Sequence, residues 1–148
     1  MQTKVESYLH NHNVATLATG IDGDVWAAAV FYVNEGFTLY FLSSPTSRHI
    51  LNLAKSPRVA LTVQEDYSDW LKIKGVQMEG IAKEISGIEE KHAIKMYGEK
   101  FPVVGLPGKA PLSIVSALSR ICWYKLLPHR IYFIDNSRGL GHREEVFL

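Results

Sequence analysis

Residues 39–49, which read LYFLSSPTSRH, decide the fold of this chain. The first four are apolar and belong to a strand that we expect over residues 37–42. The hydroxyl-rich residues that follow suit the start of a helix, with Ser44 as the N-cap and Pro45 at the first helical position. The stretch therefore predicts a strand, a tight connection and a helix that ends near Lys55, before Pro57.

An antiparallel meander precedes this stretch. Residues 14–19 and 25–33 are predicted strands, and the pair Asp22-Gly23 between them is the strongest hairpin signal in the chain. A second turn at residues 34–36 leads into the strand that carries the first apolar run. Three short strands joined by tight turns form an antiparallel meander.

The second half of the chain supplies further strands. We expect strands over residues 58–64 and 72–85, where Gly75 and Gly80 indicate a bend or a close backbone approach. A capping box at residues 86–89 predicts a helix that ends near residue 97. The remaining predicted features are helices over residues 5–10 and 112–118, a loop over residues 101–111, and two apolar runs, 122–127 and 131–135, separated by Pro128 and His129.

The length of 148 residues suits one domain and is too short for two comfortable ones. We therefore treat residues 1–148 as a single domain, in which the polar tail from about residue 136 has the weakest secondary-structure signal. The strand pattern predicts a mainly β fold with short helices. Six or seven antiparallel strands are expected to close into a barrel, because closure removes exposed sheet edges.

Composition narrows the class of protein. Hydrophobic residues make up 47% of the chain and charged residues 21%, as in ordinary globular proteins. A net charge of +1 argues against a general nucleic-acid binder. The single cysteine, Cys122, excludes an internal disulfide, and no apolar run is long enough to span a membrane or to form a signal peptide. We therefore expect a soluble, cytoplasmic protein.

Residues 43–49 could hold an anion. At a helix start the first N–H groups lack intrahelical partners, and the helix dipole favours negative charge. With a helix that starts at Pro45, those groups belong to Thr46, Ser47 and Arg48, and the Arg48 guanidinium matches a phosphate. The alternative is a well-capped helix with a solvated arginine, and the local sequence alone favours that alternative.

Two predicted strands carry weaker candidates for a ligand site. Ala27, Ala28 and Ala29 form a run of small side chains in a strand, where alanine is disfavoured, so a flat ligand could lie along the backbone. A helix packed tightly on that strand is an equally good explanation. Gln77 could hydrogen-bond a ligand edge, although an exposed polar face is the simpler explanation.

Other kinds of chemistry lack a matching pattern. The six histidines are scattered, and His10 and His12 have no carboxylate or cysteine ligand nearby in the sequence, so we expect no metal site. The sequence contains no phosphate loop, dinucleotide fingerprint or serine-hydrolase elbow. Cys122 lies beside Trp123 in an apolar strand and is expected to be a core residue rather than a nucleophile.

The order of four segments resembles the flavin-binding split-barrel family of pyridoxamine 5′-phosphate oxidase-like proteins, and within it small bacterial proteins of the YhbP type. Each segment is a weak motif alone, and their order carries the resemblance, which spans roughly residues 14–135. The segments are the hairpin of residues 14–33, the signature of residues 39–60, the strand motif GVQMEG of residues 75–80 and the closing strand pair of residues 123–131.

The resemblance implies a split barrel that binds flavin mononucleotide (FMN) and forms a homodimer with two cofactor sites across the interface. It also implies that Gln77 reaches the flavin from the other subunit. The isoalloxazine ring would lie along Ala27, Ala28, Ala29 and Val30. The residues implied to hold the phosphate are Ser43, Ser44, Ser47, Arg48 and His49.

The chain departs from the family pattern at two points. Many members carry Arg-Lys where this chain has Arg48-His49, and a neutral histidine contributes less charge opposite a phosphate dianion. The arginines with which the true oxidase grips pyridoxal phosphate also have no match, because Arg130, Arg138 and Arg143 lie at other spacings. We therefore do not carry that substrate over to this chain.

The resemblance favours a flavin-dependent oxidoreductase that acts on a small molecule, which the sequence does not identify. A non-catalytic flavin-binding or storage protein is one alternative, because no cluster for gripping a substrate is evident. A haem-binding relative is another, with His129 or His142 as the candidate iron ligand. A scaffold that binds no cofactor and serves partner contacts in a dimer is the last.

Overall fold

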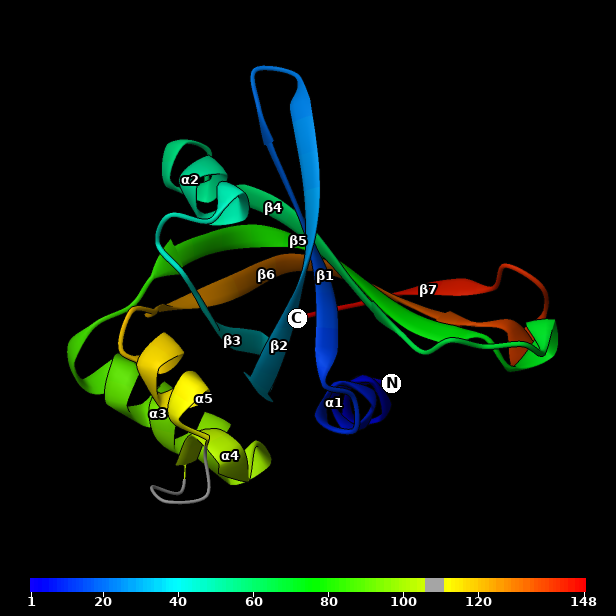
Figure 1. Cartoon of the computed structure of the whole chain (residues 1–148). Coiled ribbons are helices and arrows are strands. Elements are labelled where there is room, and N and C mark those ends of the chain that lie inside the picture. Colours follow the sequence, from blue (N-terminus) through cyan, green and yellow to red (C-terminus); the bar gives the residue numbers. More distant parts are fainter. Residues whose placement is uncertain (106–110) are drawn as a thin grey trace.

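Six antiparallel strands close into a barrel in the computed structural model, which describes residues 1–105 and 111–148 (Figure 1). The sheet runs in the order β3-β2-β1-β4-β5-β6-β7, and pairing of β3 with β6 closes it, which leaves β7 as an added outer strand. This architecture confirms the predicted mainly β, antiparallel split-barrel class. The strands are β1 (Val14–Ile21), β2 (Asp24–Glu35), β3 (Thr38–Ser43), β4 (Arg58–Gln64), β5 (Lys74–Glu84), β6 (Cys122–Asp135) and β7 (Arg143–Val146).

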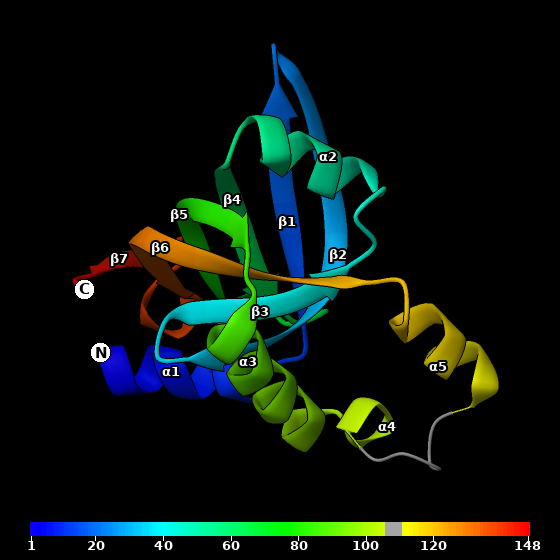
Figure 2. The ribbon, with the colours of Figure 1, turned by 90° about the vertical axis from the view of Figure 1, so that its left-hand side faces the viewer.

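Helices lie at the two ends of the barrel and on one side of it. Helix α1 lies at the lower end of the barrel in Figures 1 and 2, and α2 lies at the upper end. Helix α3 covers the outside of β2, β3 and β6, and α4 and α5 lie beyond it (Figure 2). The helices are α1 (Gln2–His10), α2 (Arg48–Lys55), α3 (Gly87–Lys100), α4 (Pro102–Gly105) and α5 (Leu112–Leu118), with the short 3-10 helices η1 (Trp70–Lys72) and η2 (Asn136–Arg138).

Alternate strand residues fill the barrel interior. In β1, Leu17 is fully buried whereas its neighbour Ala18 is exposed, as the two-residue period of a strand requires. The end helices add apolar side chains to the same core, Val5 and Leu9 from α1 and Ile50 and Leu53 from α2. The burial of these side chains holds α1 and α2 against the barrel.

The turn between β1 and β2 has the predicted hairpin chemistry. Asp22 and Gly23 have φ values of 51° and 86°, and Ile21 pairs directly with Asp24 across the turn. Two central residues with positive φ meet the requirement of a type I′ turn, whose twist matches that of the flanking strands. The hairpin predicted from Asp22-Gly23 is therefore confirmed.

Strand β6 is one strand of 14 residues, which corrects the prediction of two separate runs. The register between β5 and β6 shifts after Glu79, which pairs with Arg130. Gly80 then pairs with Pro128, so the intervening His129 is an extra residue in a β-bulge. Proline lacks the N–H that a regular ladder needs, and a bulge is one of the few positions where a sheet accepts it.

The predicted capping box at residues 86–89 is wrong in its bonding. Ser86 is the N-cap of α3 but makes no side-chain cap hydrogen bond. The Glu89 carboxylate instead contacts Lys125 Nζ at 2.7 Å and accepts a hydrogen bond from the Tyr40 hydroxyl at 3.4 Å. The tertiary partners on β3 and β6 therefore compete successfully with the local cap, and α3 extends past residue 97 to Lys100.

Two less regular regions also take shape in the structure. The predicted loop over residues 101–111 contains the short helix α4, and its residues 106–110 lie outside the described part of the chain. The polar tail forms η2 and then β7, which pairs with β6 from Ile131↔Val146 to Ile134↔Arg143. Within the two described ranges, no helix combines the length and apolarity needed to cross a membrane.

Gly80 should not accept a side chain. A Cβ there would clash with Leu127 O and lie 2.8 Å from Pro128 Cα, and both are backbone atoms that cannot turn away. We expect Gly80→Ala to lower the free energy of unfolding by about 1–3 kcal/mol, as overpacking does, when measured by urea denaturation.

Gly20→Ala is the control for this prediction. Its Cβ would lie 3.3 Å from Asp24 O near the β1–β2 turn, a contact that needs only a small shift. Equal losses of stability in the two variants would contradict a special close approach at the bulge.

Candidate functional site

Helix α2 begins later than predicted. Ser47, and not Ser44, is the N-cap, and the helix starts at Arg48. The Ser47 N–H and hydroxyl both donate to Ser44 O, at 3.1 and 2.8 Å, and the Thr46 N–H faces Ser44 Oγ at 3.4 Å. Ser44 and Pro45 therefore occupy the first two positions of a β-turn, which these residue types also favour. The predicted helical start at Pro45, with free N–H groups on Thr46 and Ser47, is wrong.

Two hydroxyls and an imidazole converge at the true start of the helix. The N–H groups without intrahelical partners are those of Arg48, His49 and Ile50. Ser43, which is buried at the end of β3, places its Oγ 2.8 Å from His49 Nε2. Ser47 Oγ lies 3.4 Å from the same nitrogen. The structure thus brings Ser43, Ser47 and His49 together beside three donors of the main chain.

The charge of this cluster comes from one side chain. Burial lowers the pKa of His49 below its usual value. The imidazole is therefore mostly neutral near pH 7. Arg48 carries the positive charge at the start of α2, as expected from the departure at His49.

Arg48 lies over an aromatic ring that the sequence analysis did not single out. Its guanidinium carbon is 4.2 Å from the centroid of the Trp26 ring, within the range of a cation–π contact. Trp26 is on β2, immediately before Ala27, and is partly exposed. Through this contact the start of α2 packs against β2, the strand on which the flavin ring is predicted to lie.

A hydrogen bond joins the same helix to β1. Asn52 Nδ2 donates to Thr19 Oγ1 at 3.0 Å, and Thr19 is only 4% exposed. Sequence reasoning missed Thr19, Asn52 and Trp26 because each forms its contact with a residue far away in the chain. A polar threonine on the inward-facing positions of β1 was the one local signal that could have drawn attention to this joint.

The side chains of residues 27–30 on β2, where the flavin ring is predicted to lie, do not all point to the same face of the sheet. Ala27 and Ala29 are exposed on the outer face of the sheet, so a helix packed tightly on them is not the reason for their small size. Ala28 points to the inner side, and Val30 is buried in the barrel core. The predicted Val30 contact with a ligand on the outer face is therefore limited to its backbone.

Gln77 lies on the same outer face but at a distance from the run on β2. The strand pairing leads from Ala29 to Thr16, from Thr16 to Thr62, and from Thr62 to Gln77. Three strand spacings correspond to roughly 14 Å along the sheet. One subunit therefore does not bring Gln77 and Ala29 into contact with each other.

The remaining reactive side chains give little support to other chemistry. Among residues 1–105 and 111–148, no group of three histidine, cysteine, aspartate or glutamate side chains is placed to hold a metal ion. Burial raises the pKa of the Cys122 thiol, and the nearby Glu84 acts in the same direction. A thiol with a raised pKa is a poor nucleophile at neutral pH.

Comparisons with known proteins agree on the family that this chain is similar to. Residues 1–135 match the family described as Pyridoxamine 5′-phosphate oxidase. The chain is 28% identical to UPF0306 protein YhbP of Escherichia coli O157:H7 over 143 residues, which are 95% of this chain and 89% of that protein. These matches confirm the predicted resemblance to the family and to proteins of the YhbP type.

Two solved structures share the fold. A haem-binding protein from Mycobacterium smegmatis matches with a TM-score of 0.74 and 24% identity over 96% of this chain, which spans 56% of that protein's length. A FAD-binding protein from Mesorhizobium loti matches with a TM-score of 0.67 and 21% identity, and the match covers 90% of this chain and 93% of that one. At these identities the likeness supports the fold and leaves the ligand of this chain open.

The half-buried His49 should make stability depend on pH. Because its folded pKa is lowered, the unfolded chain binds more protons than the folded one in the range below the usual histidine value near pH 6.5. Stability should therefore be full above about pH 6.5 and fall as the pH drops through the folded pKa. Thermal unfolding of the wild type and of His49→Gln at pH 7.5 and 5.5 measures this dependence.

We expect His49→Gln to lose part of the destabilisation that acid causes in the wild type. The control is His10→Gln, which changes an exposed histidine at the end of α1 and should keep the acid response of the wild type. A His49→Gln protein with an unchanged acid response would show that burial does not penalise the charged imidazole.

Proposed function

Because the chain belongs to the pyridoxamine 5′-phosphate oxidase family, we propose that it binds FMN, with the phosphate at the start of α2. The observation that carries the proposal is the convergence of the Ser43 and Ser47 hydroxyls on His49, beside the free N–H groups and the charge of Arg48. Helix starts of this kind bind phosphate through main-chain donors and the helix dipole.

The residues present fit a phosphate group. The main chain supplies the N–H groups of Arg48, His49 and Ile50, and Ser43 supplies a hydroxyl. The Ser47 hydroxyl, which donates to Ser44 O, would have to exchange that bond for one to the phosphate. The Arg48 guanidinium lies on the Trp26 ring, and an exposed contact of this type is worth only about 0.5–1 kcal/mol. A phosphate dianion can therefore draw the guanidinium toward itself at a small cost.

A homodimer completes the proposed site. Exposed apolar side chains lie on the outer face of the sheet, and a second subunit bound to this face would remove them from water. Gln77 of the second copy could then approach Ala27 and Ala29 across the interface, which its place in one subunit does not allow. The exposed apolar residues of this face include Val14, Val25, Phe31, Ile81 and Leu127.

The proposed activity is that of a flavin-dependent oxidoreductase acting on a small molecule. The flavin supplies the redox chemistry when it is bound. The chain's own part is to hold the phosphate at α2, to keep the ring against the small side chains of Ala27 and Ala29, and to exclude water at the dimer interface. The alternative of a flavin carrier or storage protein uses the same binding site without turnover.

Haem binding is the second candidate. His129, in the β6 bulge, is 48% exposed, and its Nε2 lies 3.7 Å from Glu79 Oε1. His129 lines a depression of about 310 Å³ on the outer face of the sheet, and Ala18 and Ala60 also line this depression. His142 is less available, since its Nε2 lies 2.6 Å from Glu144 Oε1. His129 is therefore the better placed of the two predicted iron ligands.

Arg48 gives the sharpest test of the phosphate site. We expect purified protein to be yellow and to release FMN on denaturation, and Arg48→Ala to weaken FMN binding about 10- to 150-fold, the equivalent of about 1.5–3 kcal/mol for charged hydrogen bonds. Fluorescence titration of the apoprotein with FMN measures the change. Arg138→Ala, which removes an arginine paired with Glu144, is the control. Unchanged affinity in Arg48→Ala would overturn the phosphate assignment.

The three candidate functions differ in their spectra. An oxidoreductase loses its flavin absorbance when a nicotinamide cofactor is added and regains it with an acceptor, and it does so over many turnovers. A carrier holds flavin that no physiological reductant discharges at a useful rate. A haem protein shows a Soret band that moves or disappears in His129→Ala, whereas a yellow protein without that band excludes haem as the resident cofactor.

A further inference from the structure

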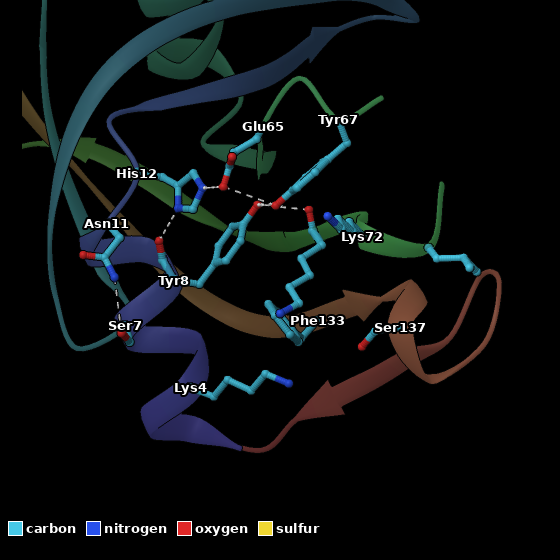
Figure 3. Close-up of a pocket in the computed structure, with 12 residues that line it drawn as sticks. Lys4, Ser7, Tyr8, Asn11, His12, Glu65, Tyr67, Lys72, Phe133 and Ser137 are labelled. Atoms are coloured by element: carbon cyan, nitrogen blue, oxygen red, sulfur yellow. Dashed lines mark hydrogen bonds and ion pairs between the residues drawn. The ribbon is translucent and has the colours of Figure 1, made fainter. Parts of the chain in front are cut away.

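A second cavity, drawn in Figure 3, lies beside α1. Figure 1 shows that α1 is at the opposite end of the barrel from α2. Its volume is about 550 Å³, within the range of small-molecule sites. Side chains reach it from α1, from the connection between β4 and β5, and from β6 (Figure 3). None of the residues assigned to the flavin site lines it.

Aromatic rings form one part of its wall. Tyr8, Tyr67 and Phe133 all line the cavity, and the rings of Tyr8 and Phe133 meet edge to face with centroids 5.6 Å apart. The Tyr8 hydroxyl donates to Lys74 O at 3.0 Å and lies 3.1 Å from the Tyr67 hydroxyl (Figure 3). Burial raises the pKa of both phenols, so they stay neutral. The wall therefore offers flat apolar surface with fixed hydroxyl groups.

Glu65 is the acidic side chain among the described residues that line the cavity. Glu65 Oε2 lies 2.7 Å from His12 Nε2, and the two side chains point toward each other in Figure 3. Lys4, which also lines the cavity, contacts the carboxylate of Asp135 at 2.9 Å, and bonds from Ser137 and Lys4 lower the pKa of that carboxyl to about 2. Asp135 thus offsets the charge of Lys4, and Glu65 contributes one negative charge to the cavity.

Two lysines remain without a carboxylate partner. Lys72 and Lys74 line the cavity, and neither makes an ion pair with any residue of the two described ranges. Lys72 is exposed, whereas Lys74 is half-buried. The cavity thus combines an aromatic wall with an excess of positive charge, which attracts anions.

We propose that this cavity binds a small aromatic carboxylate, with its ring against Tyr8, Tyr67 and Phe133 and its carboxylate toward Lys72 and Lys74. The rings provide stacking surface that a non-aromatic acid cannot use as well. The lysines provide a charge that a neutral aromatic compound cannot use. The site is independent of the flavin phosphate site, so either assignment can fail without the other.

Calorimetric titration of the full chain with 2-naphthoate tests the proposal. We expect saturable binding at one site per chain. Two matched probes separate the contributions: cyclohexanecarboxylate keeps the charge without the aromatic ring, and 2-naphthalenemethanol keeps the ring without the charge. Both should bind about tenfold more weakly or worse. Absence of saturable naphthoate binding, or equal affinity for the neutral alcohol, would overturn the proposal.

Variants locate the binding site. The double variant Lys72→Gln, Lys74→Gln should lose about tenfold or more in naphthoate affinity. Lys95→Gln, an exposed lysine on α3, should retain the affinity of the wild type. Unchanged binding in the double variant would contradict the assignment.

A measurement on the wild type covers the case of a misfolded variant. Amide resonances of Ser7, His12 and Ser137, which line the cavity, should shift on addition of naphthoate. Shifts confined to residues 43–49 would instead place the ligand at α2 and refute a separate site.

Discussion

The pairing of β3 with β6 is the constraint on which the rest of the structure depends. It joins segments that are far apart in the chain, from Leu39↔Leu126 to Ser43↔Cys122, and it closes six of the seven strands into a barrel. Closure brings inward-facing residues of β3 and β6 into one core, where Phe41 and Tyr124 stack. It also fixes Ser43 at the barrel end from which the chain enters α2.

The sequence predicted most of what depends on neighbouring residues, and less of what depends on distant ones. The hairpin at Asp22-Gly23 follows from local backbone preference, and it formed as expected. The start of α2 was misplaced because serine and proline favour a β-turn and a helix start alike, and the turn at Ser44 prevailed. The contact of Arg48 with Trp26 depends on how α2 packs against β2, so no local sequence pattern indicates it.

The two ends of the barrel carry different chemistry on one scaffold. At the α2 end, short hydroxyl side chains and main-chain N–H groups surround a neutral imidazole. At the α1 end, long lysine side chains and phenol rings surround a cavity. Both end helices pack on one continuous core of buried apolar side chains, so the two ends of the barrel are mechanically connected through that core.

Strand β7 limits how copies of this protein can associate. It is only four residues long, and three of them, Arg143, Glu144 and Glu145, are charged. A short, charged edge strand is a poor template for the addition of another strand. Lateral growth of the sheet through β7 is thereby discouraged, so the homodimer proposed above would have to form through a face of the barrel. Such a dimer would be a closed pair, because no edge of it would invite a further subunit.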